Sequence, residues 1–110
     1  MPSMLELYNQ DKLINTHRDV EKPEYETNLR ILIVDDEAGV RELLGDALRI
    51  AGFETATAPD GMSALTAIRN RKPDLLIIDI NMPLMDGFEL VERLRSTGDN
   101  TPALMLSARA

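Results

Sequence analysis

Two short apolar runs, each followed directly by acidic residues, constrain the fold of this chain more than any other feature. Residues 31–34 read Ile-Leu-Ile-Val and lead into Asp35 and Asp36, while residues 75–78 read Leu-Leu-Ile-Ile and lead into Asp79. Neither run alternates with polar residues, and both are too short for a helix. The pattern is typical of strands that are buried on both faces of a parallel sheet.

Helix-like and strand-like segments alternate along the chain around these two runs. Apolar residues recur at helical spacing over 40–48, 64–68 and 88–94, and shorter strand-like runs occupy 54–58 and 103–106. Parallel strands need crossover connections, which helices usually supply. The order therefore predicts an α/β fold, a three-layer doubly wound parallel sheet with helices on its faces.

The first part of the chain differs in amino-acid composition from the rest. Residues 1–28 are polar and mixed in charge, and Pro23 stands among charged neighbours. Such composition favours a linker over a packed element. We therefore expect a flexible polar arm over 1–28 and one folded domain over 29–110, which is as much as 110 residues allow.

Composition excludes several classes of function. A net charge of −7 argues against a nucleic-acid surface, because phosphate contacts need clustered Lys and Arg. The lack of cysteine excludes disulfides and thiolate metal sites. No apolar run approaches the roughly 20 residues of a membrane-spanning helix, and the first residues do not resemble a signal peptide. The cytoplasm, without membrane contact, is the default expectation.

The acids after the two buried runs form a candidate site. Ligands bind such sheets at the carboxyl edge of the strands, so Asp35, Asp36 and Asp79 converge if their strands are neighbours. Like charges at that range raise one another's pKa unless a cation is present, and an all-oxygen site suits Mg²⁺. The plain alternative is that each Asp caps the next helix. Three acids on two adjacent strands favour the metal site. Ser107 follows the fourth strand at the same edge.

These residues resemble the CheY-like receiver domains of bacterial two-component response regulators. The likeness is carried by Asp35-Asp36 after an apolar strand, by the stretch 79–87 and by Leu-Ser-Ala at 106–108. The stretch 79–87 is the most specific part, with an acidic residue at its start, Met-Pro after it and Asp-Gly at its end. The resemblance covers residues 29–110 and implies the flavodoxin-like receiver fold.

The resemblance also implies a role for each site residue. Asp79 would accept a phosphoryl group from a sensor histidine kinase, and Asp35 and Asp36 would hold Mg²⁺ together with Asp79. Asn81 matches the position that gives Mg²⁺ a backbone carbonyl, and Ser107 matches the switch hydroxyl. The implied function is a phosphorylation-controlled signalling module, which is a phosphoacceptor and not an enzyme in the usual sense.

Two further stretches bear on the output of such a module. Residues 41–44, Arg-Glu-Leu-Leu, and residues 86–89, Asp-Gly-Phe-Glu, look most like receivers attached to winged-helix DNA-binding domains. The resemblance therefore implies regulation of transcription, with DNA contacted only through a further domain outside these 110 residues.

The chain departs from the family's pattern at its end. A full receiver continues through a fourth helix, a fifth strand and a fifth helix, and its fifth strand carries a lysine that pairs with the phosphoryl group. Lys12, Lys22 and Lys72 do not stand where they could replace that lysine. We interpret the chain either as a fragment of a longer protein or as a receiver whose switching is compromised. An uncovered fourth strand also leads us to expect association, including a homodimer.

Other classes remain open on the residues alone. One is a degenerate receiver that acts only as an interaction domain, and another is an Mg²⁺-dependent phosphotransfer enzyme on a similar sheet. A topoisomerase-primase type domain would place Glu where Asp35 stands. A haloacid-dehalogenase-type phosphatase would need an acidic nucleophile after the first strand and a second Asp where Glu37 stands. A nucleotide-binding fold would need a glycine-rich turn after Val34.

Overall fold

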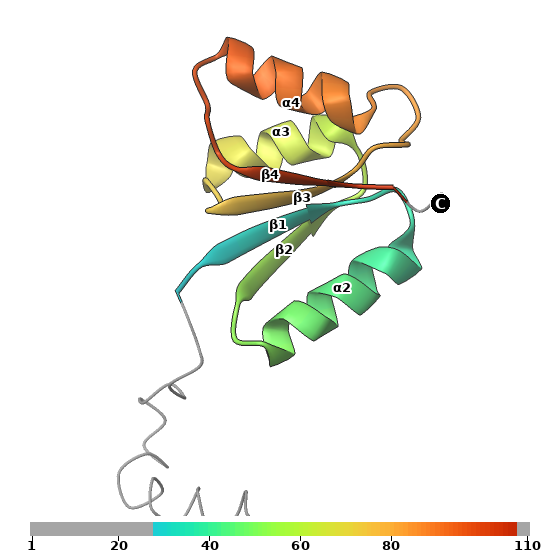
Figure 1. The fold of residues 1–110 in the computed structure, drawn as a ribbon, viewed down its shortest axis with the longest axis vertical. Coiled ribbons are helices and arrows are strands. Elements are labelled where there is room, and N and C mark those ends of the chain that lie inside the picture. Colours follow the sequence, from blue (N-terminus) through green and yellow to red (C-terminus); the bar gives the residue numbers. More distant parts are fainter. Residues whose placement is uncertain (1–27, 108–110) are drawn as a thin grey trace, which may run out of the picture.

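The computed structural model describes residues 28–107, which form one sheet with helices on both of its faces (Figure 1). The elements alternate in the order β1 (Arg30–Val34), α2 (Ala38–Ile50), β2 (Glu54–Ala58), α3 (Gly61–Asn70), β3 (Leu75–Asp79), α4 (Gly87–Ser96) and β4 (Ala103–Leu106). The α/β alternation predicted from the periodicity is confirmed. The arm predicted over 1–28 lies, apart from residue 28, outside the described residues.

The sheet is parallel, and its strands lie in the order β2-β1-β3-β4. The chain therefore winds to one side from β1 to β2 and to the other side from β1 to β3 and β4, which is the doubly wound arrangement. Val34 at the end of β1 pairs with Ile78 of β3 on one side and with Ala58 of β2 on the other. The strand order reverses between β1 and β3, so their carboxyl ends lie side by side.

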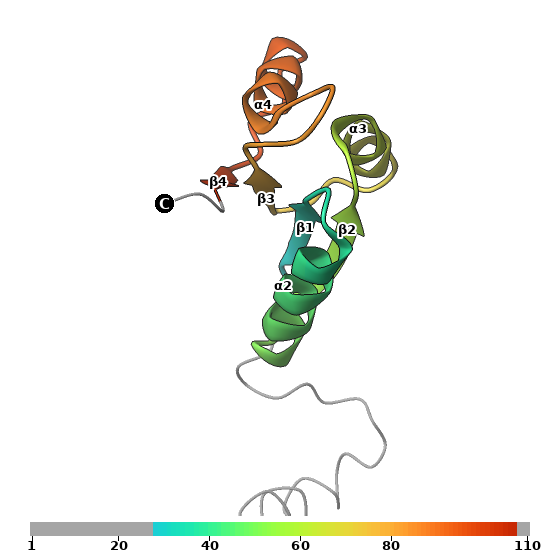
Figure 2. The same ribbon diagram turned by 90° about the vertical axis from the view of Figure 1, so that its right-hand side faces the viewer.

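The two faces of the sheet carry separate parts of the core. Leu32, Val34, Leu76 and Ile78 point toward α3 and α4 and are fully buried. The intervening residues of β1 and β3 pack with apolar residues of α2, on the opposite face (Figure 2). Because helices cover both faces of these two strands, every position over 31–34 and 75–78 is apolar. This explains the continuous apolar runs in the sequence.

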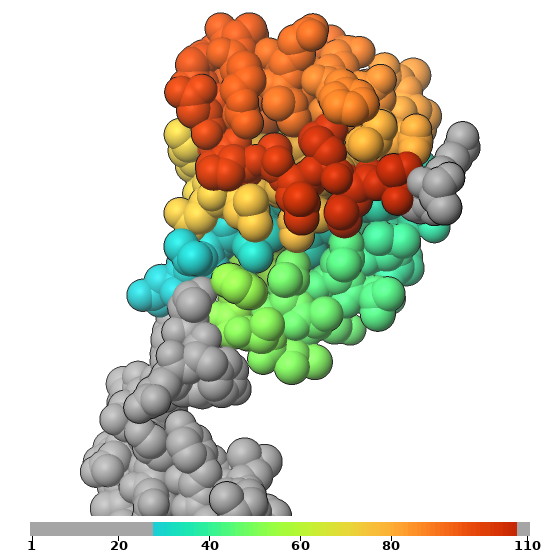
Figure 3. Space-filling model, viewed as in Figure 1, coloured from blue at the N-terminus to red at the C-terminus, as the bar shows by residue number. Residues whose placement is uncertain are grey.

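The fourth strand differs from the two central ones. Ala103 and Met105 pack toward the core beneath α4, whereas Leu104 and Leu106 are 51% and 38% exposed on the other face. In Figure 3 the residues of β4 lie open on the surface between α4 and α2. Within the described residues β4 is an edge strand, as expected.

The helices between the strands are short. Asp60 caps α3 by accepting a hydrogen bond from the Ser63 N–H at 2.7 Å, and Asp86 caps α4 by accepting from the Glu89 N–H at 2.8 Å. Over residues 28–107, no helix combines the length and the hydrophobicity that a membrane crossing requires.

Candidate functional site

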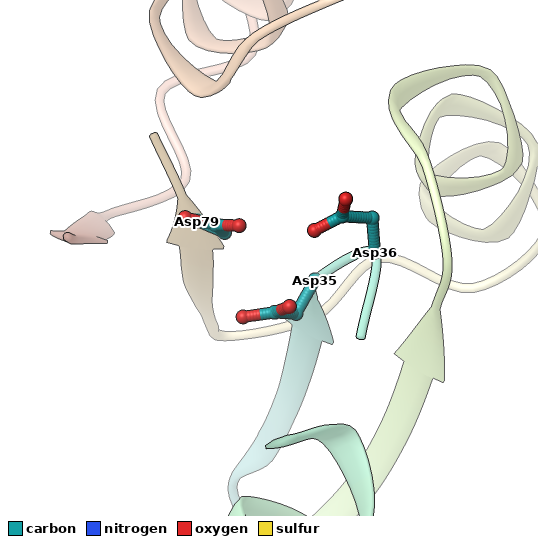
Figure 4. Close-up of side chains that lie close together, drawn as sticks. All are labelled: Asp35, Asp36 and Asp79. Carbon is teal, nitrogen blue, oxygen red and sulfur yellow. The ribbon is translucent and has the colours of Figure 1, made fainter. Parts of the chain in front are cut away.

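Three carboxylates gather at the carboxyl edge of the sheet. Asp35 and Asp36 follow β1, and Asp79 is the last residue of β3. One oxygen of each carboxylate lies within 4.8 Å of the other two, and Figure 4 shows the three side chains around one shared space. Asp35 and Asp79 are half-buried and Asp36 is exposed, so the cluster opens to solvent. The sheet thus concentrates negative charge at a point that a small ligand can reach.

Backbone pairing holds both strand ends in place. The Asp35 N–H donates to the Ala58 carbonyl at 3.1 Å, which continues the pairing of β1 with β2 by one residue. The Ile80 N–H donates to the Leu106 carbonyl at 2.9 Å, which continues the pairing of β3 with β4. Backbone hydrogen bonds therefore hold the chain at Asp35 and at the residue that follows Asp79.

The first two acids do not serve as caps of the next helix. Glu37 is the N-cap residue of α2, and its side chain makes no capping hydrogen bond. Asp35 instead accepts from the Glu37 N–H at 2.9 Å, one residue before the helix begins. The plain reading of these acids as helix caps therefore fails in this structure.

The surroundings of Asp79 disfavour its charged form. Partial burial raises the pKa of this carboxyl, the neighbouring charges of Asp35 and Asp36 raise it further, and a hydrogen bond with the Asp36 side chain acts in the same direction. The Asn81 N–H, which donates to Asp79 Oδ1 at 3.1 Å, works the other way. The upward effects win, so the cluster carries more negative charge than it can balance by itself.

A divalent cation would restore that balance. The donor set consists only of carboxylate oxygens, which are the ligands that Mg²⁺ prefers, and the exposed side leaves room for the waters that Mg²⁺ retains. The described residues therefore fit Mg²⁺ on chemical grounds. Asp35, Asp36 and Asp79 are the side chains that could hold it.

The two remaining predicted residues lie at the same edge of the sheet. Asn81 follows Asp79 by two positions and is tied to it by the N–H bond described above. The Asn81 side-chain amide nitrogen lies 3.5 Å from the Ser107 hydroxyl oxygen, which comes directly after β4. Both residues are exposed. The structure thus brings all five predicted residues to the carboxyl ends of β1, β3 and β4.

Two neighbours of the cluster were not predicted as site residues. Arg41 of α2 donates from Nη1 to the Asp35 backbone carbonyl at 2.6 Å. Gly87, the first residue of α4, lies against the backbone of Asp79 and donates its N–H to the Ile80 carbonyl at 3.1 Å. The Asp-Gly pair at 86–87 was a usable signal for the second contact. An arginine on an amphipathic helix carries no comparable signal.

The comparison with known proteins agrees with this geometry. The response regulator receiver domain family matches residues 31–110. Response regulator MprA from Mycobacterium sp. (strain KMS) is 47% identical over 81 residues, which are 74% of this chain and 35% of that protein. The chain thus spans about a third of the length of the curated relatives that it matches.

Solved structures show the same fold. Chemotaxis protein CheY4 from Vibrio cholerae superposes with a TM-score of 0.72 at 37% identity, over 76% of this chain and 72% of that one. Response regulator TrrA from Thermotoga maritima, determined in complex with Mg²⁺-BeF, superposes with a TM-score of 0.70 at 38% identity, over 74% of this chain and 71% of that one. The expectation drawn from the motif residues is confirmed, and this chain belongs to the family of response regulator receiver domains, the signalling domains of two-component systems.

Proposed function

We propose that Asp79 accepts a phosphoryl group from a histidine of a sensor kinase, with Mg²⁺ held by Asp35, Asp36 and Asp79. The observation that carries this proposal is the gathering of three carboxylates within 4.8 Å at the ends of β1 and β3. Asn81 would add its backbone carbonyl to the metal site. The proposal is further supported by TrrA, a relative of the same fold that was determined with Mg²⁺-BeF.

The transfer exchanges one bond to phosphorus for another. A carboxylate oxygen of Asp79 attacks the phosphorus, a P–O bond forms and the P–N bond to the kinase imidazole breaks. The electron pair of the P–N bond stays on the ring, which takes up one proton from solvent and leaves as neutral imidazole. The product is a mixed anhydride, an aspartyl phosphate. Because the Asn81 N–H holds Oδ1 of Asp79, the other oxygen, Oδ2, is the natural nucleophile. Hydrolysis by water later returns Asp79 to its carboxylate.

Such a transfer depends mainly on alignment and on neutralisation of charge. Asp79 must be ionised to attack, yet its surroundings raise its pKa. When bound, Mg²⁺ would favour the ionised form and offset the negative charge of the incoming group. The Ser107 hydroxyl, at the same sheet edge, would donate to a phosphoryl oxygen and thereby couple phosphorylation to the end of β4.

The proposed output is regulation of transcription in the cytoplasm. It is supported by the likeness of residues 41–44 and 86–89 to receivers that precede winged-helix domains. The DNA contact would then belong to a domain outside these 110 residues. This assignment agrees with the net charge of −7, because contacts with nucleic-acid phosphates need clustered Lys and Arg.

Phosphorylation by acetyl phosphate tests the acceptor without the kinase. Wild type with Mg²⁺ should gain the mass of one phosphoryl group, hydroxylamine should remove it, and chelation of Mg²⁺ should prevent it. Asp79→Asn should gain none, whereas Asp46→Asn, an exposed acid of α2, should behave as wild type. An Asp79→Asn chain that gains the same labile mass contradicts the assignment. A wild type that neither gains phosphate nor responds to Mg²⁺ supports the interaction-only reading instead.

A further inference from the structure

The loop that carries Asp35 and Asp36 is held at three successive peptide groups, each by a different partner. The Asp35 N–H bonds to the Ala58 carbonyl of β2 at 3.1 Å. The Asp35 carbonyl accepts from Arg41 Nη1 at 2.6 Å. The Glu37 N–H donates to the Asp35 side chain at 2.9 Å. The middle bond is the one of the three that comes from a long, charged side chain of α2.

The hydrogen bond from Arg41 to the Asp35 carbonyl can affect the positions of both Asp35 and Asp36. The Asp35 carbonyl belongs to the planar peptide that joins Asp35 to Asp36, so its direction determines the direction in which Asp36 leaves the strand. A guanidinium donor makes a charge-assisted hydrogen bond, which is stronger than one between neutral groups. Arg41 is half-buried at this contact, so water competes for it less than at an exposed site.

We infer that Arg41 is a positioning residue that sets the geometry of the Asp35 and Asp36 carboxylates for Mg²⁺. The inference rests on the metal site proposed above. The inference predicts that removal of the Arg41 side chain lowers the affinity for Mg²⁺, whereas charge repulsion alone predicts that it raises the affinity. A cationic side chain beside a cation site weakens metal binding by repulsion, so removal of the charge alone would raise the affinity for Mg²⁺. Loss of positioning would lower it.

Arg49 provides a matched control on the same helix. It lines the same hollow between α2 and β2 as Arg41 does. Its guanidinium, however, bonds to the Thr55 hydroxyl at 2.8 Å and to Asp46, and not to the loop. Arg49→Met therefore removes the same charge and leaves a similar apolar stem in the same hollow. The three hydrogen bonds at the peptide groups of the loop that carries Asp35 and Asp36 remain.

The test is an NMR titration of the 110-residue chain with MgCl₂. The amide signals of Asp36 and Ile80 report on the metal in wild type, Arg41→Met, Arg41→Lys and Arg49→Met. About 0.5 M KCl shortens the Debye length to a few ångströms and suppresses the effect of net charge. We expect Mg²⁺ to bind Arg41→Met roughly tenfold more weakly than wild type, as is usual when the support of a metal ligand is lost. Arg41→Lys should recover part of the loss, and Arg49→Met should match wild type.

A second readout needs no metal. Hydrogen exchange of the Glu37 amide should be faster in Arg41→Met than in wild type and in Arg49→Met, because the loop opens more often. Mg²⁺ affinity in Arg41→Met that equals or exceeds the wild-type value overturns the positioning role while the metal site stands. A wild type whose signals do not respond to MgCl₂ overturns the metal site, and the role of Arg41 toward Mg²⁺ with it.

Discussion

The backbone of Gly87 lies directly against the carbonyl oxygen of Asp79. A β-carbon at position 87 would stand 2.6 Å from that oxygen and 3.0 Å from Cγ2 of Ile78, both far inside van der Waals contact. Neither neighbour can move away freely, because one is strand backbone and the other is a fully buried side chain. The first turn of α4 can therefore sit over the end of β3 only if residue 87 lacks a side chain. The start of α4 is therefore packed directly against Asp79, the proposed acceptor.

Gly87→Ala should therefore destabilise the fold by about 2–3 kcal/mol, in the upper range of overpacking substitutions. Gly61→Ala is the matched control at the start of α3. Its β-carbon would stand 2.5 Å from the Met85 sulfur, 3.0 Å from Met85 Cγ and 3.1 Å from Met85 Cβ, so its three nearest contacts are with one side chain and none is with backbone. Rotation of the buried Met85 side chain relieves part of this crowding. We expect a smaller cost than at Gly87, since alanine also favours the helix. Urea unfolding of both variants tests this, and equal losses would contradict the distinction.

Much of this architecture can be predicted from the sequence, because a strand that is buried on both faces appears as a continuous apolar run. The runs 31–34 and 75–78 have no polar position, since α2 covers one face of β1 and β3 while α3 and α4 cover the other. Periodicity alone does not say that these two strands are neighbours. The conclusion that they are neighbours needs either the resemblance or the observed strand order. The gathering of Asp35, Asp36 and Asp79 depends on this neighbourhood of β1 and β3.

Other features leave no trace in the sequence because they depend on where side chains reach in three dimensions. The bond from Arg41 to the Asp35 carbonyl joins a helix to the loop before it, and any arginine on an amphipathic helix looks the same in the sequence. Leu84 adopts a φ of 69°, a conformation for which leucine has no preference. The loop around Leu84 imposes that conformation, so a reading of single residues cannot anticipate it.

The raised pKa of Asp79 predicts how stability changes with pH. A carboxyl whose pKa is raised by folding opposes folding at any pH at which the unfolded state ionises. The penalty is absent below the ordinary value of 3.8, grows as pH rises from there to the raised value and is complete above it. Asp79→Asn removes the charge and keeps an oxygen that can accept the Asn81 N–H. At about pH 7 this variant should be more stable than wild type by roughly 0.5–1 kcal/mol, the size of a partly solvated charge interaction.

Thermal unfolding with and without Mg²⁺ checks this prediction. The advantage of Asp79→Asn over wild type should vanish at about pH 3, below the ordinary pKa of an aspartate, where the raised pKa of Asp79 no longer matters. Saturating Mg²⁺ should stabilise wild type, because a ligand that binds only the native state raises its stability. The metal should stabilise Asp79→Asn less, since one ligand has lost its charge. A wild type that is more stable than Asp79→Asn in the absence of metal at neutral pH would contradict the assigned cause of the pKa shift.

The strain at Leu84 predicts a stabilising substitution in the loop that follows β3. The left-handed conformation costs a residue with a β-carbon roughly 1–2 kcal/mol, and the Leu84 side chain is fully exposed, so it regains nothing by burial. Glycine removes that strain but adds about 0.5–1 kcal/mol of backbone entropy. Leu84→Gly should therefore stabilise the domain by about 0.5–1 kcal/mol in urea unfolding. Leu84→Ala, which removes the same apolar surface but keeps the strain, should change stability little.

The two edges of the described sheet are protected to different degrees. On β2, the strand Glu-Thr-Ala-Thr-Ala begins with Glu54, which pairs with Arg30 and Arg71. On β4, the strand Ala-Leu-Met-Leu has no charged residue. Charged side chains on an edge strand are a common device against pairing with other chains. Of these two edge strands, β4 is therefore the one without a charged side chain to protect it.

This contrast predicts that the 110-residue chain self-associates through β4. Within residues 28–107 no strand pairs with the outer edge of β4, and Leu104 and Leu106 of this strand are exposed, so a second copy could pair with the strand and cover the leucines together. Leu104→Lys places a charge in that contact. We expect it to raise the Kd of self-association, measured by sedimentation, by at least about tenfold, which corresponds to roughly 1.4 kcal/mol. Leu43→Lys is the control, because Leu43 is 70% exposed on α2 and does not belong to the edge strand. If both lysine variants reduce association equally, net charge is the cause and not the edge. If the wild type stays monomeric at all concentrations, β4 is protected by something other than its own sequence.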